Sequence, residues 1–96
     1  MDVHITERNT EVSEELRQAA SDAMQELAQD EPRLTLCKVV FAETKDEQAV
    51  AAVCAIKGVG SAVAHAEGKD WKINVGLLKD RLAERIRVVC EEAEED

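Results

Sequence analysis

The chain has few aromatic side chains: one Trp, one Phe and no Tyr among 96 residues. A core of large rings is therefore excluded, and the apolar 45% of the chain, much of it Ala and Val, predicts a thin core of small side chains. No apolar run approaches the roughly 20 residues that a membrane-spanning helix requires, and no export signal opens the chain. We therefore expect a cytoplasmic protein with no membrane partner.

Cysteine, glycine and proline are also scarce. The three cysteines, Cys37, Cys54 and Cys90, are odd in number and far apart, so we expect reduced thiols and neither a disulfide framework nor a metal site. We find no nucleophile elbow, paired metal ligands or cofactor fingerprint, so neither an enzyme nor a bound cofactor is predicted. Without a Gly/Ser linker, residues 1–90 are expected to form a single domain, followed by a frayed acidic tail at 91–96.

Positive charge is outnumbered, with 12 Lys and Arg against 21 Asp and Glu, for a net charge of -9. Residues 69–87 reverse this balance, because they contain six of the basic residues and three of the acids. A cationic segment in an acidic chain favours binding to a polyanion such as RNA. A solvated helix surface accounts for the same pattern without a ligand and stays open as an alternative.

Hydrophobic periodicity predicts the order β-α-β-β-β-α. The expected strands cover residues 1–7, 34–43, 50–57 and 61–67, and the helices cover 13–29 and the segment after Asp70. In the last two strands nearly every side chain is small and apolar, so alternation leaves their buried face open. We predict an α+β two-layer sandwich in which two helices cover one face of a four-stranded sheet.

Three segments carry a resemblance to a known family. They are Ile5-Thr6-x-x-Asn9-x-Glu11-Val12-Ser13-Glu14-x-Leu16-Arg17, Ala64-x-Ala66-Glu67-Gly68-x-Asp70 and Asp80-Arg81-Leu82. In their joint order and spacing, over residues 1 to about 90, they resemble the ribosome hibernation-promoting factor and ribosome-associated inhibitor family. In length the sequence is similar to the short form of this family, whereas long members carry a further C-terminal domain with which they dimerise ribosomes; whether the sequence is the whole chain stays open.

The resemblance implies a fold akin to a double-stranded-RNA-binding domain and a function without catalysis. Family members bind the small ribosomal subunit in the channel used by messenger and transfer RNA, and silence translation in slow growth or stress. Basic residues on their two helices meet ribosomal RNA phosphates, and Arg17 and Arg81 stand where the family pattern is basic. Four positions depart from the pattern: Lys72 replaces a common aromatic, and Ala23, Glu26 and Glu84 replace basic residues.

Seven basic residues are therefore candidate RNA contacts: Arg17, Lys69, Lys72, Lys79, Arg81, Arg85 and Arg87. On a helical wheel Lys72 and Lys79 project on one flank of the apolar stripe, whereas Arg81 and Arg85 project on the other. For Arg17 the alternative to a phosphate is a pair with Glu14 or a contact with Ser21. Trp71 begins the apolar stripe, so we favour a core anchor over a base-stacking role.

A second hypothesis keeps the fold and gives up RNA binding. The first helix is acidic, which suits a protein-binding module, and small residues such as Ala51, Val53 and Ala55 allow two copies to pair through a strand edge or the uncovered sheet face. A homodimer is therefore a possible partner state. Adaptation to a high-salt cytoplasm would also explain the acidic surface, and the sequence leaves its cause open.

Overall fold

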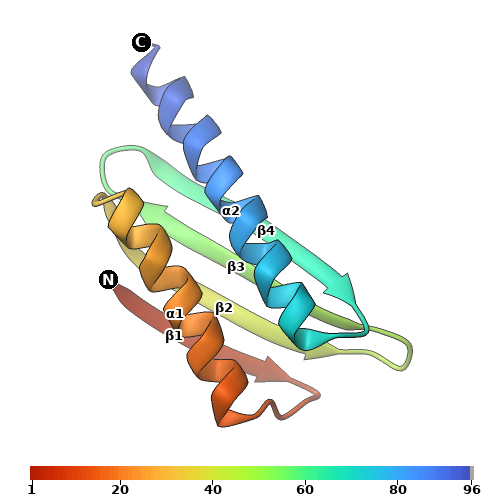
Figure 1. The fold of residues 1–96 in the computed structure, drawn as a ribbon. Coiled ribbons are helices and arrows are strands. Elements are labelled where there is room, and N and C mark those ends of the chain that lie inside the picture. Colours follow the sequence, from red (N-terminus) through yellow and green to blue (C-terminus); the bar gives the residue numbers. More distant parts are fainter. Residues whose placement is uncertain (96) are drawn as a thin grey trace.

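Two helices cover one face of a four-stranded sheet in residues 1–95, which are the residues that the computed structural model describes (Figure 1). The strands are β1 (Asp2–Arg8), β2 (Leu34–Glu43), β3 (Gln48–Ile56) and β4 (Gly60–Gly68), and the helices are α1 (Glu14–Asp30) and α2 (Trp71–Glu94). The predicted element order and α+β class are confirmed. Asp96, the last residue of the predicted tail, lies outside the described residues.

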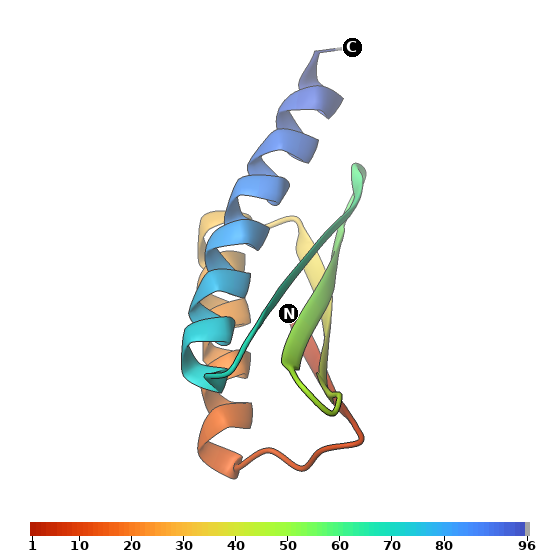
Figure 2. The same cartoon turned by 90° about the vertical axis from the view of Figure 1, so that its right-hand side faces the viewer.

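The strands lie side by side in the order β1-β2-β3-β4. β1 pairs with β2 in parallel, and β2, β3 and β4 form the predicted antiparallel meander. α1 packs over β1 and β2, and α2 packs over β3 and β4. Viewed edge-on, both helices lie on the same side of the sheet, and the opposite face carries no helix (Figure 2).

The core lies between the sheet and the helices. It shows which face of β3 and β4 is buried, which the alternation of residues in the sequence left open. Val50 and Cys54 of β3 are fully buried, and so is Ala66 of β4. Their neighbours in sequence therefore point to the uncovered face, since successive strand residues alternate. Trp71 is half-buried and packs edge-on against Phe41 with ring centroids 5.3 Å apart, which confirms it as a core anchor.

Both helices begin at the predicted caps. The Ser13 hydroxyl accepts a hydrogen bond from the Leu16 amide at 3.1 Å. One Asp70 carboxylate oxygen accepts from the amides of Lys72 at 2.9 Å and Ile73 at 3.2 Å. These side chains satisfy amides that would otherwise lack a partner in the first turn.

The acidic segment that was expected to fray continues α2 as far as Glu94, which corrects the predicted tail. Two contacts hold this extension. The Arg87 Nη1 donates to Glu91 at 2.8 Å one turn later, and Arg33 lies 3.7 Å from Glu94. Helical spacing thus supplies partners for acids that looked unpaired in the sequence.

Cys37 and Cys54 form a disulfide, which corrects the expectation of reduced thiols. Although 17 residues apart in sequence, they lie directly opposite each other in β2 and β3, with a Cα–Cα distance of 4.3 Å. Both are fully buried, and Cys37 Sγ lies 3.7 Å from the Met24 sulfur of α1. The register of β2 and β3 therefore brings together two cysteines that are far apart in the sequence. Cys90 is a free thiol.

Candidate nucleic-acid interface

The structure distributes the predicted RNA contacts over three places instead of one groove. Arg17 lies on α1, Lys69 in the loop before α2, and the other five on α2. We call the side of α2 that faces α1 the α1 flank, which carries Lys79, and the side that faces β4 the β4 flank, which carries Arg81 and Arg85. Their availability to a phosphate depends on what each guanidinium or ammonium already contacts.

Arg17 is engaged inside the protein. Its guanidinium forms an ion pair with Glu7 of β1, and Glu7 also accepts a hydrogen bond from the Val12 amide at 3.2 Å. The predicted pairing with Glu14 or Ser21 is therefore wrong, because the packing of α1 on β1 brings the Glu7 carboxylate to the guanidinium. Arg17 ties α1 to the sheet edge.

Lys79 is also paired, across the gap between the helices. Its ammonium contacts the Glu26 carboxylate of α1, and this hydrogen bond raises the pKa of Lys79. Glu26 stands at a position that is basic in the pattern of the family that the sequence resembles. An acid at this position neutralises Lys79.

Arg87 is exposed and is held by two acids of its own helix. Its guanidinium pairs with Glu84 one turn before and with Glu91 one turn after. The hydrogen bond from Arg87 lowers the pKa of Glu84, and both acids raise the pKa of Arg87. A phosphate would have to displace two carboxylates to reach it.

The β4 flank differs, because its two guanidiniums have no carboxylate partner within residues 1–95. Arg81 Nη1 donates to the His65 carbonyl of β4 at 2.8 Å, which anchors the side chain and leaves its charge unneutralised. Arg81 and Arg85 lie one turn apart, and both are exposed. They line an open hollow of about 420 Å³ with Val63, Ala64, His65, Glu84 and Val88. Paired guanidiniums on an apolar floor suit a phosphate.

Lys69 and Lys72 are exposed at the start of α2, and the described residues include no carboxylate bound to either ammonium. Both stand among acids all the same. Lys69 lines a hollow with Glu43, Asp46 and Glu47, and Lys72 lines another with Glu11 and Glu15. Nearby acids weaken their attraction for a polyanion, so among the seven candidate contacts Arg81 and Arg85 are the best placed for a phosphate, although Glu84 also lines their hollow.

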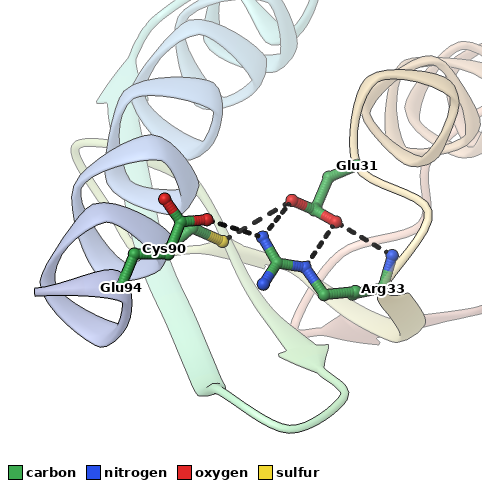
Figure 3. Close-up of polar contacts among 4 residues, drawn as sticks. All are labelled: Glu31, Arg33, Cys90 and Glu94. Carbon is green, nitrogen blue, oxygen red and sulfur yellow. Dashed lines mark hydrogen bonds and ion pairs between the residues drawn. The ribbon is translucent and has the colours of Figure 1, made fainter. Parts of the chain in front are cut away.

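A separate polar cluster closes the far end of the α1 flank (Figure 3). Glu31, which caps α1, accepts hydrogen bonds from Arg33 Nε at 2.9 Å and Nη2 at 2.8 Å. These bonds hold the pKa of Glu31 at about 2, below its ordinary value of 4.5. The Cys90 thiol of α2 lies 3.7 Å from the same carboxylate, and burial raises the pKa of that thiol. We call this cluster of Glu31, Arg33, Cys90 and Glu94 the seam, because it joins α2 to the end of α1.

Asn74 is a positioning residue that the sequence analysis did not single out. It is 1% exposed, and its amide donates to the carbonyls of Gln48 at 3.3 Å and Gly68 at 3.1 Å. A Cβ at position 68 would lie 3.0 Å from the Asn74 side chain, so Gly68 permits this close approach. The only signal was a polar residue on the apolar stripe of α2. These hydrogen bonds of Asn74 hold the first turns of α2 against β3 and β4, and they therefore help to position the β4 flank.

Comparison with solved structures matches this fold closely. A ribosomal subunit interface protein from Coxiella burnetii superposes with a TM-score of 0.78 at 22% identity, over 88% of this chain and 91% of that one. The Protein Y N-terminal domain of Thermus thermophilus superposes with a TM-score of 0.77 at 17% identity, over 90% of this chain and 96% of that one. The chain has their fold.

Comparison at the level of sequence adds nothing to this match, since neither a protein-family model nor a curated protein matches the chain. The fold implied by the family resemblance is therefore confirmed by shape. Within residues 1–95 no helix is both long and apolar enough to cross a membrane.

Proposed function

We propose that the chain is a ribosome-associated translation inhibitor of the hibernation-promoting family. It binds ribosomal RNA of the small subunit in the cytoplasm, without catalysis, and occludes the channel used by messenger and transfer RNA in slow growth or stress. The supporting observation is the β4 flank: in a chain of net charge -9, on the fold of a ribosomal subunit interface protein, it holds two guanidiniums that have no carboxylate partner among residues 1–95. Phosphate contacts supply the affinity, and the bulk of the domain blocks the channel.

The proposed contact set is smaller than the one predicted from sequence. Arg81 and Arg85 make the main phosphate contacts, with Lys69 and Lys72 as weaker contributors. The three remaining candidates already form ion pairs with carboxylates of this chain; they are Arg17, Lys79 and Arg87. A disulfide is unusual for a cytoplasmic protein, but both Cys37 and Cys54 are fully buried, which limits access of reductants to their sulfurs.

Co-sedimentation with purified small ribosomal subunits tests this function. We expect binding at low salt that weakens steeply as salt rises, and competition with a messenger RNA fragment. Arg81→Glu and Arg85→Glu should each reduce binding, whereas Lys57→Glu makes the same charge change in the exposed β3–β4 turn and should have little effect. No binding at low salt, where the electrostatic attraction is largest, would refute the proposal.

The second candidate is a protein-binding module that has lost RNA binding. The pairing of Arg17, Lys79 and Arg87 with internal acids favours it. If this candidate is right, the folded protein should fail to bind ribosomal subunits in the same assay at every salt concentration.

A further inference from the structure

The uncovered face of the sheet differs in charge from the rest of the molecule. Strand alternation and register assign to it every second residue of each strand, from Asp2 to Arg8 on β1 and from Ser61 to Glu67 on β4. Its ionised side chains are two acids, Asp2 and Glu67, and two bases, Arg8 and Lys38, which sum to zero. The face is therefore neutral on a protein whose net charge is -9.

The middle of this face is apolar and built from small residues. Val40, Ala42, Ala49, Ala51, Val53 and Ala55 occupy its two central strands. Val53 is 37% exposed, and Val63 on β4 is 61% exposed. A shallow hollow of about 200 Å³ lies among Leu36, Val53 and Ala55. Small side chains let another sheet approach closely, so the face can pack against a flat apolar surface.

We propose that this open face pairs with the open face of a second copy in a symmetric dimer. The arrangement of charges on the face is the reason for choosing a second copy as the partner. Arg8, Ala42, Ala49 and Glu67 lie in one row across the four strands. A two-fold axis parallel to the strands, between β2 and β3, sets β1 of one copy over β4 of the other.

That symmetry brings Arg8 opposite the second copy's Glu67, and the same contact repeats on the other side. It also sets Val40 over the second copy's Ala51, and Ala42 over its Ala49. Lys38 falls over Val53 of the second copy and must extend its flexible stem to keep the ammonium in water. The face is thus complementary to itself in shape and in the Arg8–Glu67 pairs, whereas Lys38 and Asp2, which falls over Ser61 of the second copy, meet no opposite charge.

The size of the face indicates a weak, reversible dimer. Four strands about 4.8 Å apart and about seven residues long give roughly 450 Å² of sheet plane per copy. Two copies bury roughly 900 Å², below the range of stable specific interfaces. The dimer leaves both helical layers on its outside, so Arg81 and Arg85 stay accessible, but it covers Val63 and His65, which also line the hollow beside them.

Sedimentation equilibrium of the full chain tests the dimer, from about 10 μM to about 1 mM. We expect a mass that rises from 10.6 kDa toward twice that value with concentration. The association should strengthen with salt, because salt screens the repulsion between two chains of charge -9. RNA binding should weaken with salt, so the two activities are distinguishable.

Matched substitutions locate the contact. Val53→Arg should abolish association, whereas Leu77→Arg, on the outer side of α2 and also 37% exposed, should leave it unchanged. Val63→Lys and Ile73→Lys form a second pair, each at 61% exposure, in case an arginine at position 53 disturbs folding. Circular dichroism of each variant checks that the fold is intact.

A charge exchange tests the orientation. Arg8→Glu or Glu67→Arg alone should weaken association roughly threefold to tenfold, and the double variant should restore it. Lys38→Met should strengthen it. A strict monomer of 10.6 kDa at every concentration and salt would overturn the proposal and leave the face to a different protein. Equal effects of Val53→Arg and Leu77→Arg would overturn it as well.

Discussion

The two flanks of α2 use their basic residues differently. On the α1 flank Lys79 pairs with Glu26, and further along the seam joins Arg33 to Glu31. On the β4 flank Arg81 contacts only a backbone carbonyl and Arg85 has no carboxylate partner within residues 1–95. The α1 flank therefore contributes an ion pair between the helices, while the guanidiniums of the β4 flank are not neutralised by a carboxylate of residues 1–95. Counting cations along the sequence does not separate these two uses.

The largest effect should come from reversing both charges of the β4 flank. Arg81→Glu with Arg85→Glu removes two phosphate contacts and adds two repulsions, so we expect about 100-fold weaker binding to small ribosomal subunits at low salt. Quantitative co-sedimentation measures it. Lys79→Glu with Glu26→Lys exchanges a pair on the α1 flank and serves as the control. Equal losses in both double variants would erase the difference between the flanks.

The salt dependence should separate the flanks next. Each phosphate contact contributes about -0.7 to -0.9 to the slope of log affinity against log salt concentration. Arg85→Ala removes one phosphate contact, so it should reduce the magnitude of that slope by about 0.7 to 0.9. Lys79→Ala should reduce it by less, since its ammonium already has a carboxylate partner. Binding titrations from low to high salt measure both slopes, and identical slopes would contradict the assignment.

Removing the partner of Lys79 should move the α1 flank toward the behaviour of the β4 flank. Glu26→Gln releases the ammonium and deletes a repulsive acid, so we expect RNA binding to rise roughly threefold. The free energy of unfolding should change little, because the pair is exposed. Binding and thermal unfolding of the same sample provide the two measurements. Unchanged binding would mean that this flank lies away from the RNA.

Substitutions in the seam should change the free energy of unfolding and leave RNA binding unchanged. The pKa of Glu31 in the folded state is about 2 against 4.5 as its ordinary value, so folding favours its ionised form. Its contribution is present above about pH 4.5 and is lost as the pH falls toward 2. Glu31→Gln should be less stable at pH 7 and show a flatter acid profile in urea unfolding at a series of pH values. A profile parallel to that of the unmodified protein would contradict this.

The smallest effect should appear in the chemistry of Cys90. Its thiol is 7% exposed and burial raises its pKa, so it should react slowly with a thiol reagent near neutral pH. Arg33→Ala loosens the seam and should speed the reaction, because labelling requires the seam to open. Arg85→Ala on the β4 flank is the matched control. Cys37 and Cys54 should stay unlabelled without a reductant, because they are joined in a disulfide.

Much of the fold was predictable from short-range signals. Ser13 and Asp70 mark the helix starts, and the strand limits agree with the structure to within about two residues. Such signals are local, since caps and alternation depend on neighbouring residues. The face of β3 and β4 was not predictable, because small apolar side chains occupy both sides of these strands. Packing of α2 against Val50, Cys54 and Ala66 decides which side is buried.

The site was predictable only as a list of cations. Helical spacing correctly divides Lys79 from Arg81 and Arg85. It gives no warning that Glu26 lies beside Lys79, 53 residues away in sequence, or that Glu7 lies beneath Arg17. These partners come from different elements, and their distances depend on how the layers pack.

The elements, their order and the local excess of positive charge in residues 69–87 are readable from the amino-acid sequence. The tertiary structure alone decided which cations are neutralised, which cysteines are joined and which sheet face stays open. The reason is physical. Helix and strand formation follow interactions within a few residues, whereas ion pairs and disulfides require atoms that only the folded chain brings within a few ångströms.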